Sequence, residues 1–262
     1  MKRRGGAGRR EDAEEVRIFG LQACRTLAQE RPQDVLRAYL VEARLPDFKA
    51  LLERMAKDRR AYHLVDKDEL DRVTASLHHE GVCFYARPRP ELDLESLRKS
   101  LEKQAGPRRV VVLDRVENPN NVGAILRVAA HFGASAVVYT TPDGEPIRSS
   151  AIQRTAEGAA ERVDLVFAPD VWEALDALDG AGFEVVGTSG RGEEALWSKP
   201  LPARMALLLG SEAEGVDEAL LARIDRVISI PGTGAVESLN VSCAAAVILG
   251  EAWRAAAPTN AR

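Results

Sequence analysis

Three segments of the sequence combine glycine with short polar side chains, and each follows a run of apolar residues. They are Glu117–Arg127, Gly210–Gly215 and Pro231–Ser242. Glycine in such a turn lets the backbone approach a flat ligand closely. Ser238 and Asn240 precede a predicted helix, where short polar side chains cap the helix or bind a ligand. The apolar residues beside these turns that are suited to enclose an adenine ring are Leu209, Ile230 and Leu239.

These segments need a sheet to bring them together, and the sequence predicts one. The apolar runs expected to be strands are Arg109–Asp114, Ala136–Tyr139, Asp164–Phe167, Phe183–Gly187, Met205–Leu209 and Val227–Ile230. Helical stretches such as Ala124–Phe132 and Trp172–Leu178 lie between them. Buried strands that alternate with helices indicate a parallel α/β sheet, which binds ligands beyond the carboxyl ends of its strands.

The front of the chain predicts a second, smaller unit. Its expected helices and strands, in chain order, are Gln22–Leu27, Val35–Val41, Phe48–Asp58, Ala61–Val65, Lys67–Ala75 and Gly81–Ala86. This pattern indicates a small α/β domain over residues 15–88. We expect a basic flexible tail over residues 1–14, a linker over residues 89–108, and the larger domain over residues 109–257.

Composition excludes several classes of protein. No apolar run approaches the roughly 20 residues of a membrane span, and no apolar segment follows the basic N-terminus as in a signal peptide, so we expect a cytoplasmic protein. Three separated cysteines and four histidines without ligand spacing predict no disulfide framework and no metal site, and the cysteines are expected to be buried.

Charge is distributed unevenly along the chain. The formal net charge is −4, but residues 1–88 carry 18 Lys and Arg against 15 Asp and Glu, whereas the remainder is acidic. Contacts with phosphate need local rather than total positive charge, so the front domain is the expected nucleic-acid contact. A nicotinamide-binding domain is disfavoured, because no GxGxxG follows the first strand of the larger domain.

The three segments resemble the signature motifs of a known family. Asn-x-Gly-Ala-Ile-x-Arg at 121–127, Leu-Gly-Ser-Glu-x-x-Gly at 209–215, and Ile-Pro with Ser-Leu-Asn-Val-Ser at 230–242 are similar to those of the SpoU/TrmH RNA 2'-O-ribose methyltransferases. Phe19–Ala23 and His79–Val82 resemble the substrate-binding domain of its ribosomal-RNA members. The whole chain resembles the uncharacterised bacterial tRNA/rRNA methyltransferase branch.

This resemblance implies a fold and a reaction. The larger domain should have the SPOUT fold, a mostly parallel sheet with a deep trefoil knot, which is an exception to the rule that chains do not thread. The resemblance implies a homodimer through the knotted region, and transfer of a methyl group from S-adenosylmethionine to a ribose 2'-hydroxyl in rRNA or tRNA. The small domain should bind that RNA.

The resemblance also implies roles for individual residues. Those expected at the cofactor are Thr188, Ser189, Gly190, Leu209, Gly210, Ser211, Ile230 and Leu239. Those matching catalytic or active-site positions are Asn121, Arg127, Glu212, Ser238 and Asn240.

The chemistry of this set leaves alternatives open. In the family proposal the ribose proton goes to the arginine, here Arg127, yet arginine side chains ordinarily stay charged. Arg127 could instead clamp a phosphate and stabilise the developing alkoxide, or simply be an exposed helix residue. Asn121 could cap its helix or bind substrate, and Glu212 is expected to orient Asn121 or its loop rather than touch phosphate.

Two rival functions remain at this stage. One is an RNA-binding member of the family that has lost catalysis, and the other is a knotted enzyme that methylates a base nitrogen. The front-domain arginines expected to find the RNA are Arg17, Arg25, Arg37, Arg44, Arg59 and Arg60. Because this domain has few aromatic residues, shape and phosphate contacts are expected to outweigh base stacking.

Overall fold

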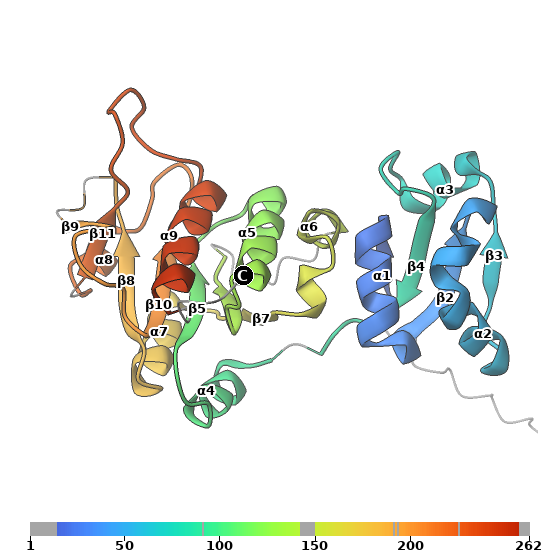
Figure 1. Cartoon of the computed structure of the whole chain (residues 1–262), viewed down its shortest axis with the longest axis horizontal. Coiled ribbons are helices and arrows are strands. Elements are labelled where there is room, and N and C mark those ends of the chain that lie inside the picture. Colours follow the sequence, from blue (N-terminus) through green and yellow to red (C-terminus); the bar gives the residue numbers. More distant parts are fainter. Residues whose placement is uncertain are drawn as a thin grey trace, which may run out of the picture. The chain divides into compact units, whose positions relative to one another are not determined.

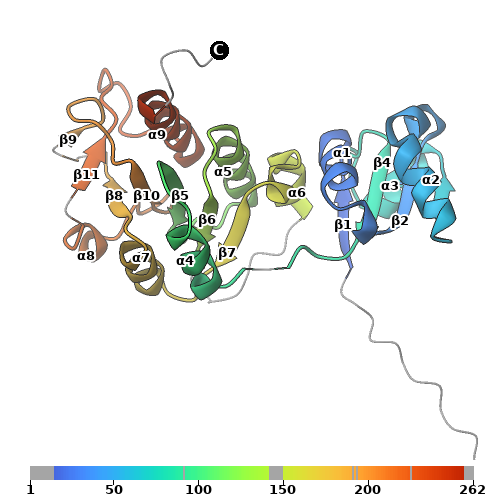
Figure 2. The same cartoon turned by 60° about the horizontal axis from the view of Figure 1, so that its bottom comes forward.

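A computed structural model of the chain describes residues 15–90, 92–141, 150–190, 192, 194–224 and 226–256. The chain divides into two compact units, Met1–Arg89 and Pro90–Arg262, and each is described by itself. Figures 1 and 2 show the helices and strands of both units from two directions. The tail predicted over residues 1–14 lies outside the described residues.

The first unit is a four-stranded sheet with helices packed on it. Its elements are β1 (Val16–Phe19), α1 (Leu21–Glu30), β2 (Val35–Leu40), α2 (Lys49–Lys57), β3 (Tyr62–Leu64), α3 (Lys67–Thr74) and β4 (Val82–Ala86), with 3-10 turns at Pro32–Asp34 and Glu42–Phe48. The strands lie in the order β1-β4-β2-β3, with β2 and β3 parallel and the other pairs antiparallel. Strand β1 is additional to the elements that the sequence predicts.

The two faces of this sheet are covered differently. Apolar side chains of α1 and α2, among them Leu27 and Met55, pack with Phe84 and its neighbours into one buried cluster. On the other face a smaller cluster forms where Leu70 of α3 meets Phe19 and Cys83. One face is therefore closed by two helices and the other by one short helix.

The second unit is the larger α/β domain. Its elements are α4 (Leu94–Glu102), β5 (Arg108–Leu113), α5 (Pro119–His131), β6 (Ala136–Tyr139), α6 (Ser150–Ala156), a 3-10 turn at Ala159–Glu161, β7 (Asp164–Phe167), α7 (Val171–Gly180), β8 (Glu184–Thr188), β9 (Glu194–Ala195), β10 (Arg204–Leu209), α8 (Glu218–Leu221), β11 (Arg226–Ser229) and α9 (Val241–Ala256). The strand order is β7-β6-β5-β10-β8-β11-β9, and every neighbouring pair is parallel. The predicted parallel α/β sheet is confirmed.

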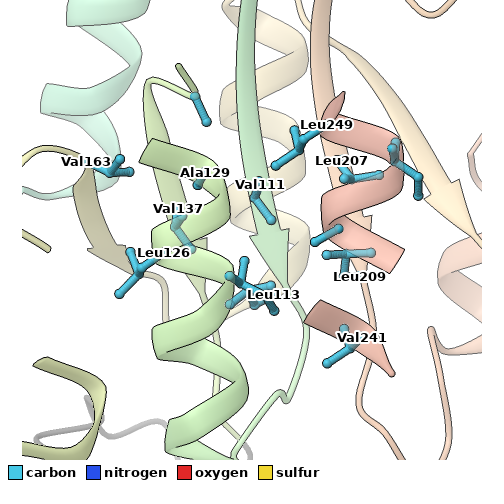
Figure 3. Packing of buried hydrophobic residues seen from close by; sticks show 14 of the residues in the cluster. Val111, Leu113, Leu126, Ala129, Val137, Val163, Leu207, Leu209, Val241 and Leu249 are labelled. Atoms are coloured by element: carbon cyan, nitrogen blue, oxygen red, sulfur yellow. The ribbon is translucent and has the colours of Figure 1, made fainter. Parts of the chain in front are cut away.

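The central strands are apolar on both sides because helices cover both faces of the sheet. Val111 and Leu207 point to a cluster with α5 and α9, and Figure 3 shows these two helices side by side over that face. Val110 and Val112 point to a second cluster with α4, α7 and α8. Burial of these strands under helices on both faces explains why their sequences are almost continuously apolar.

The segment 89–108, expected to be a linker, contains packed structure. Helix α4 begins after Asp93, whose carboxylate accepts a hydrogen bond from the Ser96 amide at 2.7 Å. Leu97 and Leu101 of this helix are buried in the second cluster. Charged residues on its outer face gave the segment a linker composition, although two leucines four positions apart anchor it.

The strand order also bears on the expected knot. Strand β10 pairs with both β5 and β8, so it is inserted between two strands that precede it in the chain. Strand β11 then lies on the far side of β8. This order is consistent with the trefoil knot, which stays a prediction.

Two further expectations concern cysteines and membranes. Cys24 and Cys83 are buried, but Cys243 is exposed in the first turn of α9, so the expectation of three buried cysteines is wrong for that residue. Within the described residues no helix is long and apolar enough to cross a membrane. In that same part of the chain no group of three His, Cys, Asp or Glu side chains is placed to hold a metal ion.

Candidate active site at the carboxyl edge of the sheet

The start of helix α5 positions the first motif. Asn118 is the capping residue, since its side-chain oxygen accepts the Asn120 amide at 3.0 Å, and Pro119 occupies the first helical position. Asn121 is therefore the third residue of the helix and does not cap it, which corrects that alternative. Its side chain is free of the capping role and points to neighbouring loops.

Asn121 lies at the centre of a hydrogen-bonded chain of side chains from three segments. Its amide nitrogen donates to Glu212 Oε1 in the turn after β10. Its oxygen accepts a bond from Asn240 Nδ2 at 3.2 Å, and Asn240 Oδ1 in turn accepts from Ser242 N at 2.9 Å and Ser242 Oγ at 2.6 Å. The three motifs predicted from the sequence are thus joined directly, and Asn240 caps α9.

The turn after β10 is built on a very close backbone approach. A Cβ atom on Gly210 would lie 2.0 Å from the carbonyl carbon and oxygen of Gly215 and 2.2 Å from the Val216 nitrogen. The Gly215 amide donates to Ser211 O at 2.9 Å, and Gly215 has a φ of 73°. Residue 210 must therefore be glycine if Glu212 is to be held opposite Asn121.

Leu209 departs from its expected role at this turn. Its side chain is only 2% exposed and packs in the core on the α5–α9 face of the sheet, as Figure 3 shows. Its carbonyl oxygen accepts the Asp114 amide at 2.8 Å. The leucine supports the turn from below, so the expectation that its side chain encloses an adenine is wrong.

The loop after β8 meets the other two cofactor segments at the same edge. Thr188 Oγ1 donates to Leu208 O at 3.0 Å, which ties the end of β8 to β10. The Ser189 amide donates to Ile228 O at 3.0 Å, which ties the loop to β11. A Cβ on Gly190 would lie 3.3 Å from Glu237 O, so this loop runs close to the loop that precedes α9.

The long loop between β11 and α9 is the exposed part of the site. Residues 231–240 are all exposed, and among them Leu239 shows 48% of its surface and Val236 72%. Ile230, at the start of the loop, is half-buried against the core. Ser238 lies in the exposed stretch.

Arg127 stands apart from the hydrogen-bonded chain. It is six residues beyond Asn121, which is about 9 Å along the helix axis, and its Nη1 atom lies 2.7 Å from Glu157 Oε1. Helix α6 brings Glu157 there because it packs closely on α5: a Cβ on Gly123 would lie 2.7 Å from Thr155 Cβ. Both charged side chains stay about half exposed, at 59% and 44%.

Arg115 is a charged residue of this edge that the motifs did not indicate. It follows β5, has a φ of 54°, and donates to Asp114 Oδ2 at 3.3 Å and to Glu214 Oε2 at 3.1 Å. The adjacent Asp114 carboxylate raises the pKa of the Arg115 guanidinium. This ion pair links the turn after β5 to the turn after β10.

Two known family models match the chain. The model described as the SpoU rRNA Methylase family covers residues 108–250, and the model for RNA 2'-O ribose methyltransferase substrate binding covers residues 17–92. The first alone spans more than half of the sequence. The chain belongs to the SpoU rRNA methylase family. The resemblance to SpoU/TrmH enzymes that the three motifs indicated is confirmed.

Relatives of this SpoU methylase match it over nearly its whole length. The uncharacterized tRNA/rRNA methyltransferase YfiF of Escherichia coli is 40% identical over 247 residues, which cover 94% of this chain and 70% of that protein. The 23S rRNA (guanosine-2'-O-)-methyltransferase RlmB of Pseudomonas putida is 33% identical over 242 residues, which cover 91% and 96%.

Solved structures share the fold of this SpoU methylase. A crystal structure of an RNA 2'-O ribose methyltransferase matches with a TM-score of 0.75 and 25% identity, covering 94% of this chain and 90% of the other. The SpoU methyltransferase AviRb from Streptomyces viridochromogenes, crystallised with the cofactor AdoMet, also has a TM-score of 0.75, at 22% identity, covering 92% and 90%. The latter likeness concerns the fold alone.

Sequence reasoning missed three residues of this edge. Ser242 lies inside the quoted third motif and has the signal of a hydroxyl two residues after the capping asparagine. Arg115 and Glu157 carry no such signal, because each takes its place through a left-handed backbone conformation that the sequence does not announce.

Proposed function

We propose that this chain transfers a methyl group from S-adenosylmethionine to the 2'-hydroxyl of a ribose in rRNA or tRNA. The observation that carries the proposal is the Asn121–Glu212–Asn240 chain of hydrogen bonds, which joins all three family motifs at the carboxyl edge of the sheet. Relatives named as 2'-O-methyltransferases over nearly their whole length support it.

The residues at this edge fit an adenosine-containing cofactor. The close packing of Gly210 on Gly215 leaves the turn after β10 compact, and Gly190 lets the loop after β8 run close to the Glu237 carbonyl of the loop before α9. Backbone amides and carbonyls suit an adenine edge, and the exposed Leu239 side chain suits its face. The residues proposed to hold the cofactor are Thr188, Ser189, Gly190, Gly210, Ser211, Ile230 and Leu239, with Leu209 acting only as the support beneath.

The chemistry asked of the protein is mainly positioning. When bound, S-adenosylmethionine supplies a methyl group on a positively charged sulfur, which is a good leaving group. The ribose oxygen must then be held in line, and such orientation contributes up to about 7–11 kcal/mol in ideal cases. Asn121 and Asn240 are proposed to orient the ribose, with Glu212 fixing the rotamer of Asn121. Ser238, two residues before Asn240, is proposed to contribute to the same site.

Arg127 is proposed as a phosphate clamp rather than a base. Its guanidinium lies 2.7 Å from a carboxylate oxygen of Glu157, a contact that suits a cation and supports this role. A charged guanidinium donates two parallel hydrogen bonds to a phosphate and stabilises a developing alkoxide. The ribose proton then passes to water or to the neighbouring phosphate.

The small domain is proposed to bind the RNA, and its arginines are largely engaged. Arg25 and Arg44 pair with Asp47, and Arg37 pairs with Glu15. The other members of the expected set that donate to backbone carbonyls are Arg17 and Arg60. Contacts of these five arginines with phosphate therefore compete with the bonds that they already make. Arg59, the remaining member of the set, is exposed.

We also propose a homodimer formed by the large domain, in the cytoplasm, where rRNA and tRNA reside. Besides Leu239, three large apolar side chains are exposed among the described residues of this domain: Trp197, Val236 and Trp253. All belong to segments that follow β8, and covering them is favourable at about 25 cal/mol per Å². Sedimentation velocity should give twice the mass of one chain, and a single-chain mass at micromolar concentration would contradict this.

The first experiment is transfer of labelled methyl groups from S-adenosylmethionine to total RNA of a strain lacking this protein, followed by mapping of the label. We expect a 2'-O-methyl ribose. A label on a base nitrogen would keep the fold and overturn the chemistry. Binding of cofactor and RNA without incorporation would favour the RNA-binding member that has lost catalysis.

The same assay tests Arg127. We expect Arg127→Ala to abolish transfer while cofactor binding survives, because the guanidinium acts on the RNA. Arg98→Ala is the control, since Arg98 is another helix arginine paired with a glutamate, at 2.9 Å, but on the opposite face of the sheet. Near-normal turnover of Arg127→Ala would defeat the assignment.

A further inference from the structure

One face of the small domain gathers aromatic and cationic side chains in neighbouring register positions. Tyr85 of β4 is paired with Arg17 of β1 on one side and Arg37 of β2 on the other. In the next row Tyr39 of β2 is paired with His63 of β3. Because cross-strand partners share a face, all five side chains lie on the same side of the sheet.

These side chains contact one another by stacking, edge-to-face and cation–π interactions. The Tyr39 and His63 rings are stacked, with centroids 4.7 Å apart and planes at 18°. Tyr39 and Tyr85 meet edge to face at 5.8 Å, and the Arg37 guanidinium lies 4.5 Å from the centre of the Tyr85 ring. The three rings and the guanidinium form a continuous group across three strands. We name the three rings, Tyr39, His63 and Tyr85, the aromatic face.

The aromatic face borders the part of the sheet that helix α3 covers. Tyr39 and Tyr85 pack partly against the cluster that Leu70 of α3 forms with Phe19 and Cys83, whereas the His63 end is open. His63 is exposed, Arg37 keeps 42% of its side chain exposed, and the two tyrosines are half-buried. Strand β3 is the outermost strand and all of it is exposed, so the stacked His63 ring lies at an open edge.

The chemistry of this face suits an unpaired nucleobase. Aromatic rings and guanidinium planes are the surfaces on which single-stranded RNA bases stack. Arg37 beside Tyr85 supplies positive charge for an adjoining phosphate, whereas Arg17 donates to Val73 O of α3. An apolar partner would not use the cations. Glu15, paired with Arg37, offsets part of that charge, so stacking rather than phosphate attraction should dominate binding.

We propose that the aromatic face of Tyr39, His63 and Tyr85 binds unpaired nucleotides of the RNA by base stacking. The proposal rests on the proposed RNA 2'-O-methyltransferase function and names how its small domain recognises the substrate. It revises the expectation that shape and phosphate contacts outweigh stacking: the aromatic residues are few, but they are placed together.

The test uses the full chain and a single-stranded RNA decamer of adenosines carrying one 2-aminopurine, with a ten-base-pair RNA duplex as comparison. The wild-type protein should bind the decamer and quench the 2-aminopurine, which is the signature of stacking. His63→Ala and Tyr39→Leu should each weaken decamer binding about fivefold to a hundredfold and relieve the quenching. Leucine keeps apolar volume at the half-buried position, and His63 is exposed, so both variants should fold.

Tyr62→Ala is the matched control. Tyr62 is next to His63 in the same strand and is 43% exposed, but it is paired with Ala38 and faces the other side of the sheet. This variant should bind like the wild type. The salt dependence of decamer binding should be the same in all variants, because stacking releases no counterions.

Several outcomes would overturn the aromatic face. These are no binding of the decamer by the wild type, unchanged binding and quenching in both variants, or equal losses in Tyr62→Ala. The methyl-transfer assay reports separately on the proposed function. Stacking without transfer would refute that function alone, and transfer without an effect of Tyr39 or His63 would refute the aromatic face alone.

Discussion

Replacing Gly210 by alanine is the sharpest perturbation that the large domain offers. The added Cβ would lie 2.0 Å from Gly215 C and O and 2.2 Å from Val216 N. All three are backbone atoms, so no side chain can turn away to make room. An ordinary contact begins at 3.4 Å, and the two strands of the turn must therefore separate by about 1.4 Å.

The structure also shows where this displacement goes. Leu209 and Val216, which flank the turn, are buried at 2% and 7% exposure and hold its ends. The strain therefore moves the exposed residues between them, which include Glu212, away from Asn121. Overpacking of this kind costs about 1–3 kcal/mol of stability. A domain of this size then loses roughly 2–4 °C in melting temperature for each kcal/mol.

Isothermal titration with S-adenosylmethionine and a thermal melt measure the two consequences. We expect Gly210→Ala to stay folded and to lose at least tenfold in cofactor affinity, which is about 1.4 kcal/mol. Gly180→Ala is the control, because a Cβ there meets nothing within 4 Å and the residue ends α7 at the opposite edge of the sheet. Unchanged cofactor affinity in Gly210→Ala, or an equal loss in Gly180→Ala, would refute the reasoning.

Two further predictions concern other parts of the chain. Glu157→Gly should leave stability within about 1 kcal/mol, because removing a left-handed non-glycine strain of about 1–2 kcal/mol offsets the lost exposed ion pair and the greater freedom of glycine. The kcat of this variant should not fall, because Arg127 exchanges Glu157 for a phosphate when the RNA binds, and a tenfold fall in kcat would refute that exchange. Burial raises the pKa of Cys83 to about 12 and that of Cys24 well above its ordinary value, so iodoacetamide at pH 8 should modify only Cys243 until the protein is unfolded. Because the folded-state pKa of Cys83 is raised, the stability that its neutral thiol contributes is complete below about pH 9. This stability is lost as the pH rises and the thiol of the unfolded chain ionises. A urea denaturation midpoint that did not fall between pH 8 and 10 would contradict this.

The sheet of the large domain could be predicted closely because its strands are buried on both faces. Ala136–Tyr139 and Asp164–Phe167 were predicted with the bounds that the structure gives them. Helix α4 lies in the segment that the sequence predicts to be a linker, since its charged outer face and the prolines around it mask Leu97 and Leu101. Strand β1 was not predicted, because Arg17 interrupts its apolar residues and the segment does not stand out without knowledge of its partner β4.

The candidate site was predictable where a motif carries both the side chain and its position. Asn121, Glu212 and Asn240 meet as expected because each follows the carboxyl end of a strand in one parallel sheet. Glu157 could not be predicted, since its contact with Arg127 depends on how closely α6 packs at Gly123. Tertiary packing of this kind leaves no local signal.

Because Arg127 lies apart from Asn121 and Asn240, we infer that it has a different role in the site from theirs. The side-chain nitrogen and oxygen of Asn121 are both hydrogen-bonded, to Glu212 and to Asn240, so Asn121 is fixed before any substrate binds. Arg127 is half exposed and its ion pair among the described residues is with Glu157, so its guanidinium can exchange that carboxylate for a phosphate and remain paired with an anion. An in-line transfer to a 2'-hydroxyl requires both a rigid group that orients the ribose and a cation that binds the neighbouring phosphate.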